Sequence, residues 1–67
     1  MLFNILVSVS YITDTSEYNL MGFAADRSDF PSMTDEEIKT ALTHKYTTRF
    51  EVEQGHTVRR IDIAFFD

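Results

Sequence analysis

The stretch FNILVSVSYI, residues 3 to 12, alternates apolar and polar side chains and decides the expected fold. Its odd positions are all apolar, whereas its even positions mix apolar residues with Asn4, Ser8 and Ser10. Successive side chains of a β-strand point to opposite faces, so this period of two predicts a strand with one buried face. We therefore expect the odd-numbered side chains in a core and the even-numbered ones uncovered.

The next segments predict a turn, a second strand and a loop. TDTSE at 13–17 is rich in short hydroxyl and carboxylate side chains, which bond nearby backbone groups in turns. YNLMGFAA at 18–25 is compatible with a returning strand, although Asn19 and Gly22 are weak strand formers. DRSDFPSM at 26–33 has the composition of a loop.

A helix is expected after this loop. Thr34 and Glu37 have the spacing of a capping box, and Met33 and Ile38 occupy the positions of a hydrophobic staple. The acidic residues at 35–37 fill the first turn, where the helix dipole favours negative charge.

The helix is expected to present one apolar stripe and one ion pair. Asp35 and Lys39 are spaced for an i,i+4 pair. The stripe extends over about three turns and consists of Ile38, Ala41, Leu42 and Tyr46.

The stretch FEVEQGHTVRRIDIAFF, residues 50–66, favours a β-hairpin with a two-residue Gly55-His56 loop. This register places three cross-strand pairs, namely Phe50 with Ile61, Glu51 with Arg60 and Arg49 with Asp62. Arg59 then lies on the other face, opposite Val52 and near the tip, with its charged end in water.

These elements predict one α+β domain over residues 1–67, a small two-layer sandwich. We expect a three- or four-stranded, mostly antiparallel sheet with one helix on one face. A chain of 67 residues has room for one small core. The sheet side of this core is expected to comprise Phe3, Ile5, Val7, Val9, Phe50, Val52, Ile61, Ile63 and Phe65.

Composition excludes several classes of protein. The chain is 43% hydrophobic, which argues against disorder, and it contains no cysteine for a disulfide, a thiolate zinc site or thiol catalysis. The first twelve residues lack the basic start and the cleavage site of a signal peptide. We expect a cytoplasmic protein without membrane association.

We also expect no enzyme, no cofactor and no metal site. The sequence carries none of the common catalytic or nucleotide-binding motifs, and His44 and His56 are expected in structural or solvent-exposed roles. A single helix on a small sheet leaves little volume for a ligand cavity. Asp26 and Asp29 lack the spaced ligand series of a calcium loop, so a hydrogen-bonded turn is favoured there.

The favoured hypothesis is a small acidic protein-binding module that acts by occlusion. The net charge is −5, and residues 1–37 carry seven acidic residues against Arg27 alone. The uncovered sheet face would present an apolar patch of Leu2, Leu6, Ile12, Ala64 and Phe66. The expected contacts are Leu2, Leu6 and Phe66, with electrostatic steering by Asp14, Glu17, Asp26 and Asp29.

Small inhibitors encoded by phages or other mobile elements share this size and character, and the basic channel of a host nucleic-acid enzyme is an example of the expected target. Two alternatives stay open. The first is a nucleic-acid-binding protein that uses a basic patch of Lys45, Arg49, Arg59 and Arg60. The second is a homodimer subunit that pairs through its open sheet face or an edge strand.

Overall fold

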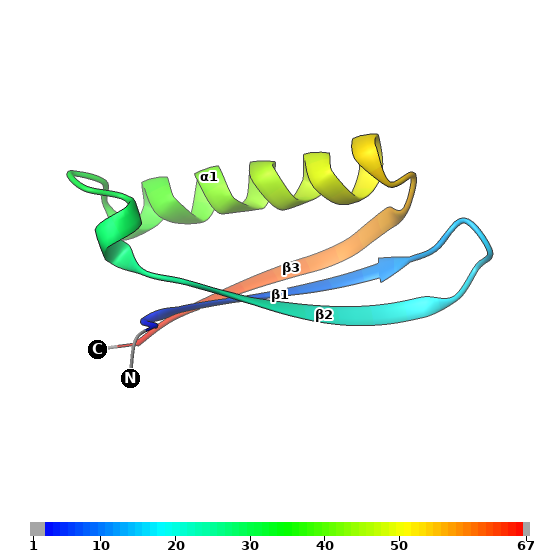
Figure 1. Cartoon of the computed structure of the whole chain (residues 1–67), viewed down its shortest axis with the longest axis horizontal. Helices are drawn as coiled ribbons and strands as arrows, with labels where there is room; N and C mark the ends of the chain where they lie inside the picture. Colours follow the sequence, from blue (N-terminus) through cyan, green and yellow to red (C-terminus); the bar gives the residue numbers. More distant parts are fainter. Residues whose placement is uncertain (1–2, 67) are drawn as a thin grey trace.

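The computed structural model of the chain describes residues 3–66. Its elements are β1 (Ile5–Ile12), β2 (Tyr18–Ala25), α1 (Asp35–Thr47) and β3 (Thr57–Phe65). The strands form an antiparallel sheet in the order β2-β1-β3, and α1 lies along one face of it (Figure 1). This confirms the expected small α+β fold, with three strands and with residues 18–25 as one of them.

The central strand β1 has the alternating burial that its sequence predicts. Its odd-numbered side chains are at most 7% exposed and face α1, whereas Leu6 is 43% exposed. Phe3 was expected in the core but is 49% exposed. Pairing of β1 with both neighbouring strands begins at Ile5, so Phe3 lies beyond the end of the sheet.

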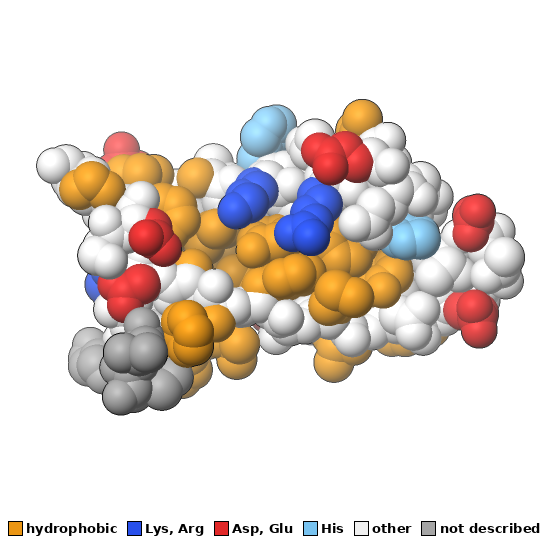
Figure 2. All heavy atoms as spheres, viewed as in Figure 1, with side chains coloured by type: hydrophobic (Ala, Val, Ile, Leu, Met, Phe, Trp, Pro, Cys, Tyr) orange, Lys and Arg blue, Asp and Glu red, His pale blue; other side chains and the backbone are white. Residues whose placement is uncertain are grey.

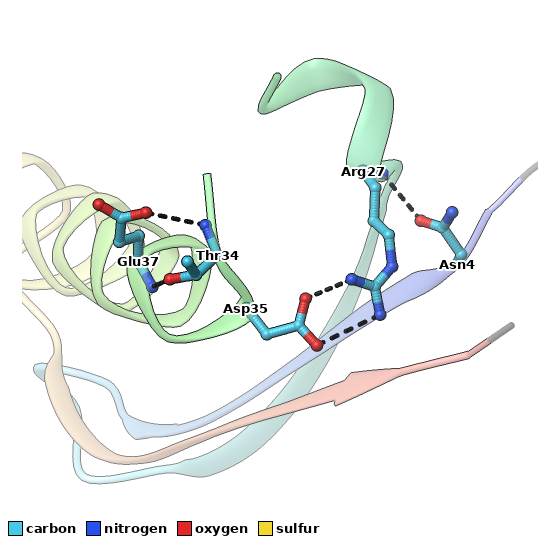
Figure 3. A network of polar contacts seen from close by, with 5 residues as sticks. All are labelled: Asn4, Arg27, Thr34, Asp35 and Glu37. Carbon is cyan, nitrogen blue, oxygen red and sulfur yellow. Dashed lines mark hydrogen bonds and ion pairs between the residues drawn. The ribbon is translucent and has the colours of Figure 1, made fainter. Parts of the chain in front are cut away.

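The first turn of α1 confirms the predicted capping box. The Glu37 backbone N–H donates to the Thr34 hydroxyl at 3.2 Å, and the Glu37 carboxylate accepts from the Thr34 N–H at 2.8 Å (Figure 3). The predicted stripe also faces the sheet: Ile38, Leu42 and Tyr46 are buried.

The predicted ion pair between Asp35 and Lys39 is wrong. The Arg27 guanidinium binds the Asp35 carboxylate instead (Figure 3). The Lys39 ammonium lies 3.7 Å from the Glu36 carboxylate. The Arg27 backbone N–H donates to the Asn4 side chain at 2.8 Å, which holds the loop beside the helix. Arg27, which lies outside the helix, therefore replaces Lys39 as the ionic partner of Asp35.

The predicted hairpin is also wrong, because Thr48–Glu53 continues the helix with wider π-helical turns. Phe50 is 1% exposed and packs in the core, whereas Val52, also expected in the core, is 78% exposed. The three predicted cross-strand pairs are therefore absent. β3 pairs with the central strand β1 instead.

The apolar spacing explains this outcome. Ile38, Leu42, Tyr46 and Phe50 are separated by four residues each, and all are buried. An α-helix rotates by about 40° with every four residues, so wider turns at the end of the series keep Phe50 over the sheet.

Gly55 ends this helix and does not form a hairpin turn. Its φ of +73° lies in the left-handed region, which glycine adopts without strain. The His56 N–H then donates to the Phe50 carbonyl at 2.8 Å and closes the last turn.

A β-bulge in β3 explains the two adjacent arginines. Ser10 pairs with Arg60 and Tyr11 pairs with Val58, which leaves Arg59 as an extra residue. Val58 and Ile61 on either side pack against the core. Both arginines therefore lie on the sheet face opposite α1.

Candidate protein-binding surfaces

The sheet face opposite α1, here called the open face, is largely apolar. Side chains directly opposite each other in paired strands share a face, so the even positions of β1 and their partners define it. Tyr18 and Leu20 are its most exposed apolar residues, at 67% and 68%. The apolar members along the three strands are Leu6, Ile12, Tyr18, Leu20, Ala24 and Ala64.

Phe66 extends the open face beyond the end of β3. Its N–H donates to the Asn4 carbonyl at 2.8 Å, which continues the pairing of β3 with β1. Its side chain is 52% exposed. The structure thus places two predicted contact residues, Leu6 and Phe66, on one face, whereas Leu2 lies outside the described residues.

The charges on the open face are concentrated on β3. The Arg60 guanidinium lies 2.9 Å from the Asp62 carboxylate, so the predicted partner Glu51 is replaced by a residue of the same strand. Both side chains are exposed, and such a pair contributes little to stability. The two opposite charges cancel, so this pair adds no net charge to the open face.

The four predicted steering residues form two groups, not one acidic patch. Asp14 and Glu17 lie in or beside the β1–β2 turn, and Asp26 and Asp29 lie in the segment that follows β2. These segments are at opposite ends of the molecule, whose long axis measures 39 Å (Figure 1). Among residues 3–66, no cluster of three or more acidic or histidine side chains is arranged to hold a metal ion.

Asp26 begins a short 3-10 turn, Arg27–Asp29. Its carboxylate accepts from the Ser28 backbone N–H at 2.9 Å. That bond, together with one from the Ser28 hydroxyl, lowers the pKa of Asp26 below its ordinary value of 3.8. This is the hydrogen-bonded turn that the sequence favours at this position.

The Asp26 cap predicts a small effect at acidic pH. The folded-state pKa is lowered, so the contribution to stability is present above 3.8 and disappears as the pH falls through the folded-state value. Asp26→Asn retains the cap acceptor but cannot ionise. We expect the difference in melting temperature between the two proteins to shrink below pH 3.8; a difference that is the same at every pH would contradict this assignment.

The four basic residues of the nucleic-acid alternative are divided between the two faces of the sheet. On the α1 side, the Arg49 guanidinium lies 5.4 Å from the Phe23 ring centroid and the Lys45 ammonium lies 5.5 Å from that of Tyr46. These two rings stack with centroids 4.5 Å apart. Figure 2, in which α1 lies above the sheet, shows basic side chains above a band of hydrophobic ones.

Arg59 and Arg60 lie on the open face, so they do not join Lys45 and Arg49 in one patch. The two histidines also lie apart. His44 is exposed on α1, whereas the His56 ring stacks on Tyr11 with centroids 5.0 Å apart. Two depressions on the outer side of α1, both lined by Glu36 and Thr40, are open to solvent.

Tyr18 and Leu20 were not named from the sequence. Their position follows from the short 13–17 turn: pairing Ile12 with Tyr18 gives even residues of both strands the same face. A firm assignment of the second strand would therefore have identified them.

Comparison with protein-family models, with curated proteins and with solved structures found no match for this chain. Within residues 3–66, no helix is long and apolar enough to span a membrane. Its function is therefore inferred from its own surfaces.

Proposed function

We propose that the protein acts by binding another protein through the open face of its sheet. The observation that supports this is the apolar surface of Leu6, Tyr18, Leu20 and Phe66, each at least 43% exposed on one side of the sheet. Grouped apolar side chains on an uncovered face are typical of interaction surfaces. Because the two acidic groups flank the sheet at its ends, they would steer a basic partner toward it.

Such binding would act by occlusion: the protein would cover a functional surface of its partner, which requires no catalytic group. A target with a basic surface, such as the nucleic-acid channel of an enzyme, fits the negative net charge of −5. An inhibitor from a phage or another mobile element remains the closest analogy in size and character.

Leu6→Asp tests this proposal. The side chain is exposed on the open face, so the charge stays in water and the fold is expected to persist. A charge in the centre of an apolar interface is expected to weaken partner capture by at least about tenfold. The measurement is a pull-down from a lysate of the source organism's host, with circular dichroism to verify folding.

Thr43→Asp is the matched control, because it adds the same charge on the exposed surface of α1. A partner retained by the wild type and by Thr43→Asp but lost by Leu6→Asp supports the proposal. Equal retention by all three proteins contradicts it. If sedimentation shows a dimer of the wild type and a monomer of Leu6→Asp, the open face binds a second copy of this chain.

Nucleic-acid binding is less well supported, because its four cations do not lie on one surface. Phosphate contacts are strongest at low salt. Absence of DNA and RNA binding at about 50 mM salt would exclude this alternative.

A further inference from the structure

Within residues 3–66, the sheet has two edge strands, β2 and β3, and the edge of β3 is the protected one. Its bulge at Arg59 interrupts the regular edge, and Arg60 and Asp62 add charge. The Glu51 carboxylate also accepts from the Val58 backbone N–H at 3.0 Å. Bulges, charges and covering groups are the devices by which native sheets prevent a further strand from pairing.

Among the residues that the structure describes, none provides such protection along β2. Its eight residues, YNLMGFAA, contain no charged residue and no proline, and they pair with β1 without a register shift. Among residues 3–66, the backbone hydrogen bonds found for β2 are those with β1. Its outer edge therefore offers a row of backbone donors and acceptors to an added strand.

The charges around β2 identify the kind of strand that fits. Asp14 and Glu17 lie before its first residue, and Asp26 and Asp29 follow its last; Arg27, between these two, is paired with Asp35. In the view of Figure 2, acidic side chains lie at both ends of the long axis of the molecule. A second copy pairing along all of β2 would bring acidic groups together in either orientation, which is unfavourable.

The α1 side of β2 adds a further constraint. Arg49 lies over the ring of Phe23, the sixth of the eight residues of β2. Cations of an added segment are therefore favoured at its ends, beside the acidic groups, and disfavoured at its centre.

We propose that the outer edge of β2 binds an extended segment of a partner protein. The segment is uncharged over about eight residues, the length of β2, and carries lysine or arginine at both ends. The inference rests on the proposed function, because it specifies how a protein partner docks. The proposed site differs from the open face, however, because its main contacts are the backbone groups at the outer edge of β2.

Synthetic peptides test this inference by fluorescence anisotropy. The first peptide has eight alternating valines and threonines with two lysines at each end. The second has the same core with two glutamates at each end, and the third has the lysines moved to the centre. We expect the first to bind at least about tenfold more tightly than the others at low salt, with this preference lost near 1 M salt.

A fourth peptide, N-methylated at alternate residues of the pairing edge, tests the backbone contact. We expect it to lose binding although its charge is unchanged, because methylation removes the N–H donors. Amide resonances of residues 18–25 should shift on binding of the first peptide. Equal affinity for all four peptides, or shifts confined to other residues, would overturn the inference.

Variants separate this inference from the proposed function. The combined substitution D14N/E17Q/D26N/D29N should abolish the preference for lysine ends, whereas Thr43→Asp, on the exposed surface of α1, should leave peptide binding unchanged. If partner capture depends on Leu6 but no peptide binds, the edge site is refuted and the proposed function stands. Concentration-dependent shifts at residues 18–25 without peptide would show that a second copy occupies the edge, and would also refute it.

Discussion

Replacing Phe50 by alanine is expected to unfold a large fraction of the protein at room temperature. The side chain is 1% exposed, and its ring centroid lies 4.7 Å from that of Tyr11 and 6.0 Å from that of Phe23. Truncating a buried phenylalanine costs about 3–5 kcal/mol. The total stability of a domain of this size is on the order of 3–10 kcal/mol, so this loss removes much of it.

Urea denaturation followed by circular dichroism would measure this loss, and Val52→Ala is the matched control. Val52 is 78% exposed, so its truncation is expected to change the free energy of unfolding by no more than about 0.5 kcal/mol. In a β-hairpin, residues 50 and 52 would share the core face and their truncations would both be costly. Similar losses from both variants would therefore contradict the helical path of residues 48–53.

Features that depend on local interactions could be predicted from the sequence. The capping box of Thr34 and Glu37 needs only residues three apart, and the burial of β1 follows from its period of two. These two signals were enough to predict one helix, one strand and the side of that strand that becomes the core.

The path of residues 48–53 could not be predicted from the signals used. Phe50 and Val52 alternate with glutamates, and Gly55 with His56 fits a hairpin loop. A glycine with positive φ also ends helices, so the same residues are consistent with both structures. The apolar series with a spacing of four, which extends from α1 to Phe50, was the signal in favour of the helix.

The candidate surfaces were predicted only in part. The alternation of side chains along each strand predicted that Leu6 and Phe66 lie on the open face. This prediction needs no knowledge of strand order. The separation of the acidic residues, the division of the basic ones and the unprotected edge all depend on which strands are neighbours. Alternating sequence patterns do not specify that order.

Ile5→Asp is expected to unfold the protein near neutral pH, whereas Leu6→Asp is expected to fold. Ile5 is 1% exposed on the central strand, between Ala25 and Phe65, so an aspartate there would place a carboxylate without an ionic partner in the core. Burial of an unpaired charge is costly enough that the group instead stays protonated in the folded state.

The pH dependence of Ile5→Asp separates this mechanism from a simple loss of packing. The aspartate would have a folded-state pKa above its unfolded value of about 3.9, so its penalty is smallest below that pH and grows as the pH rises. Relative to Ile5→Asn, the variant should therefore lose stability from about pH 4 upward in thermal melts, because asparagine is of similar size but cannot ionise. Leu6→Asp relative to Leu6→Asn should show little such dependence, since its carboxylate reaches water. If Leu6→Asp unfolds the chain as thoroughly as Ile5→Asp, both faces of the sheet are core, and the open face is not available to a partner.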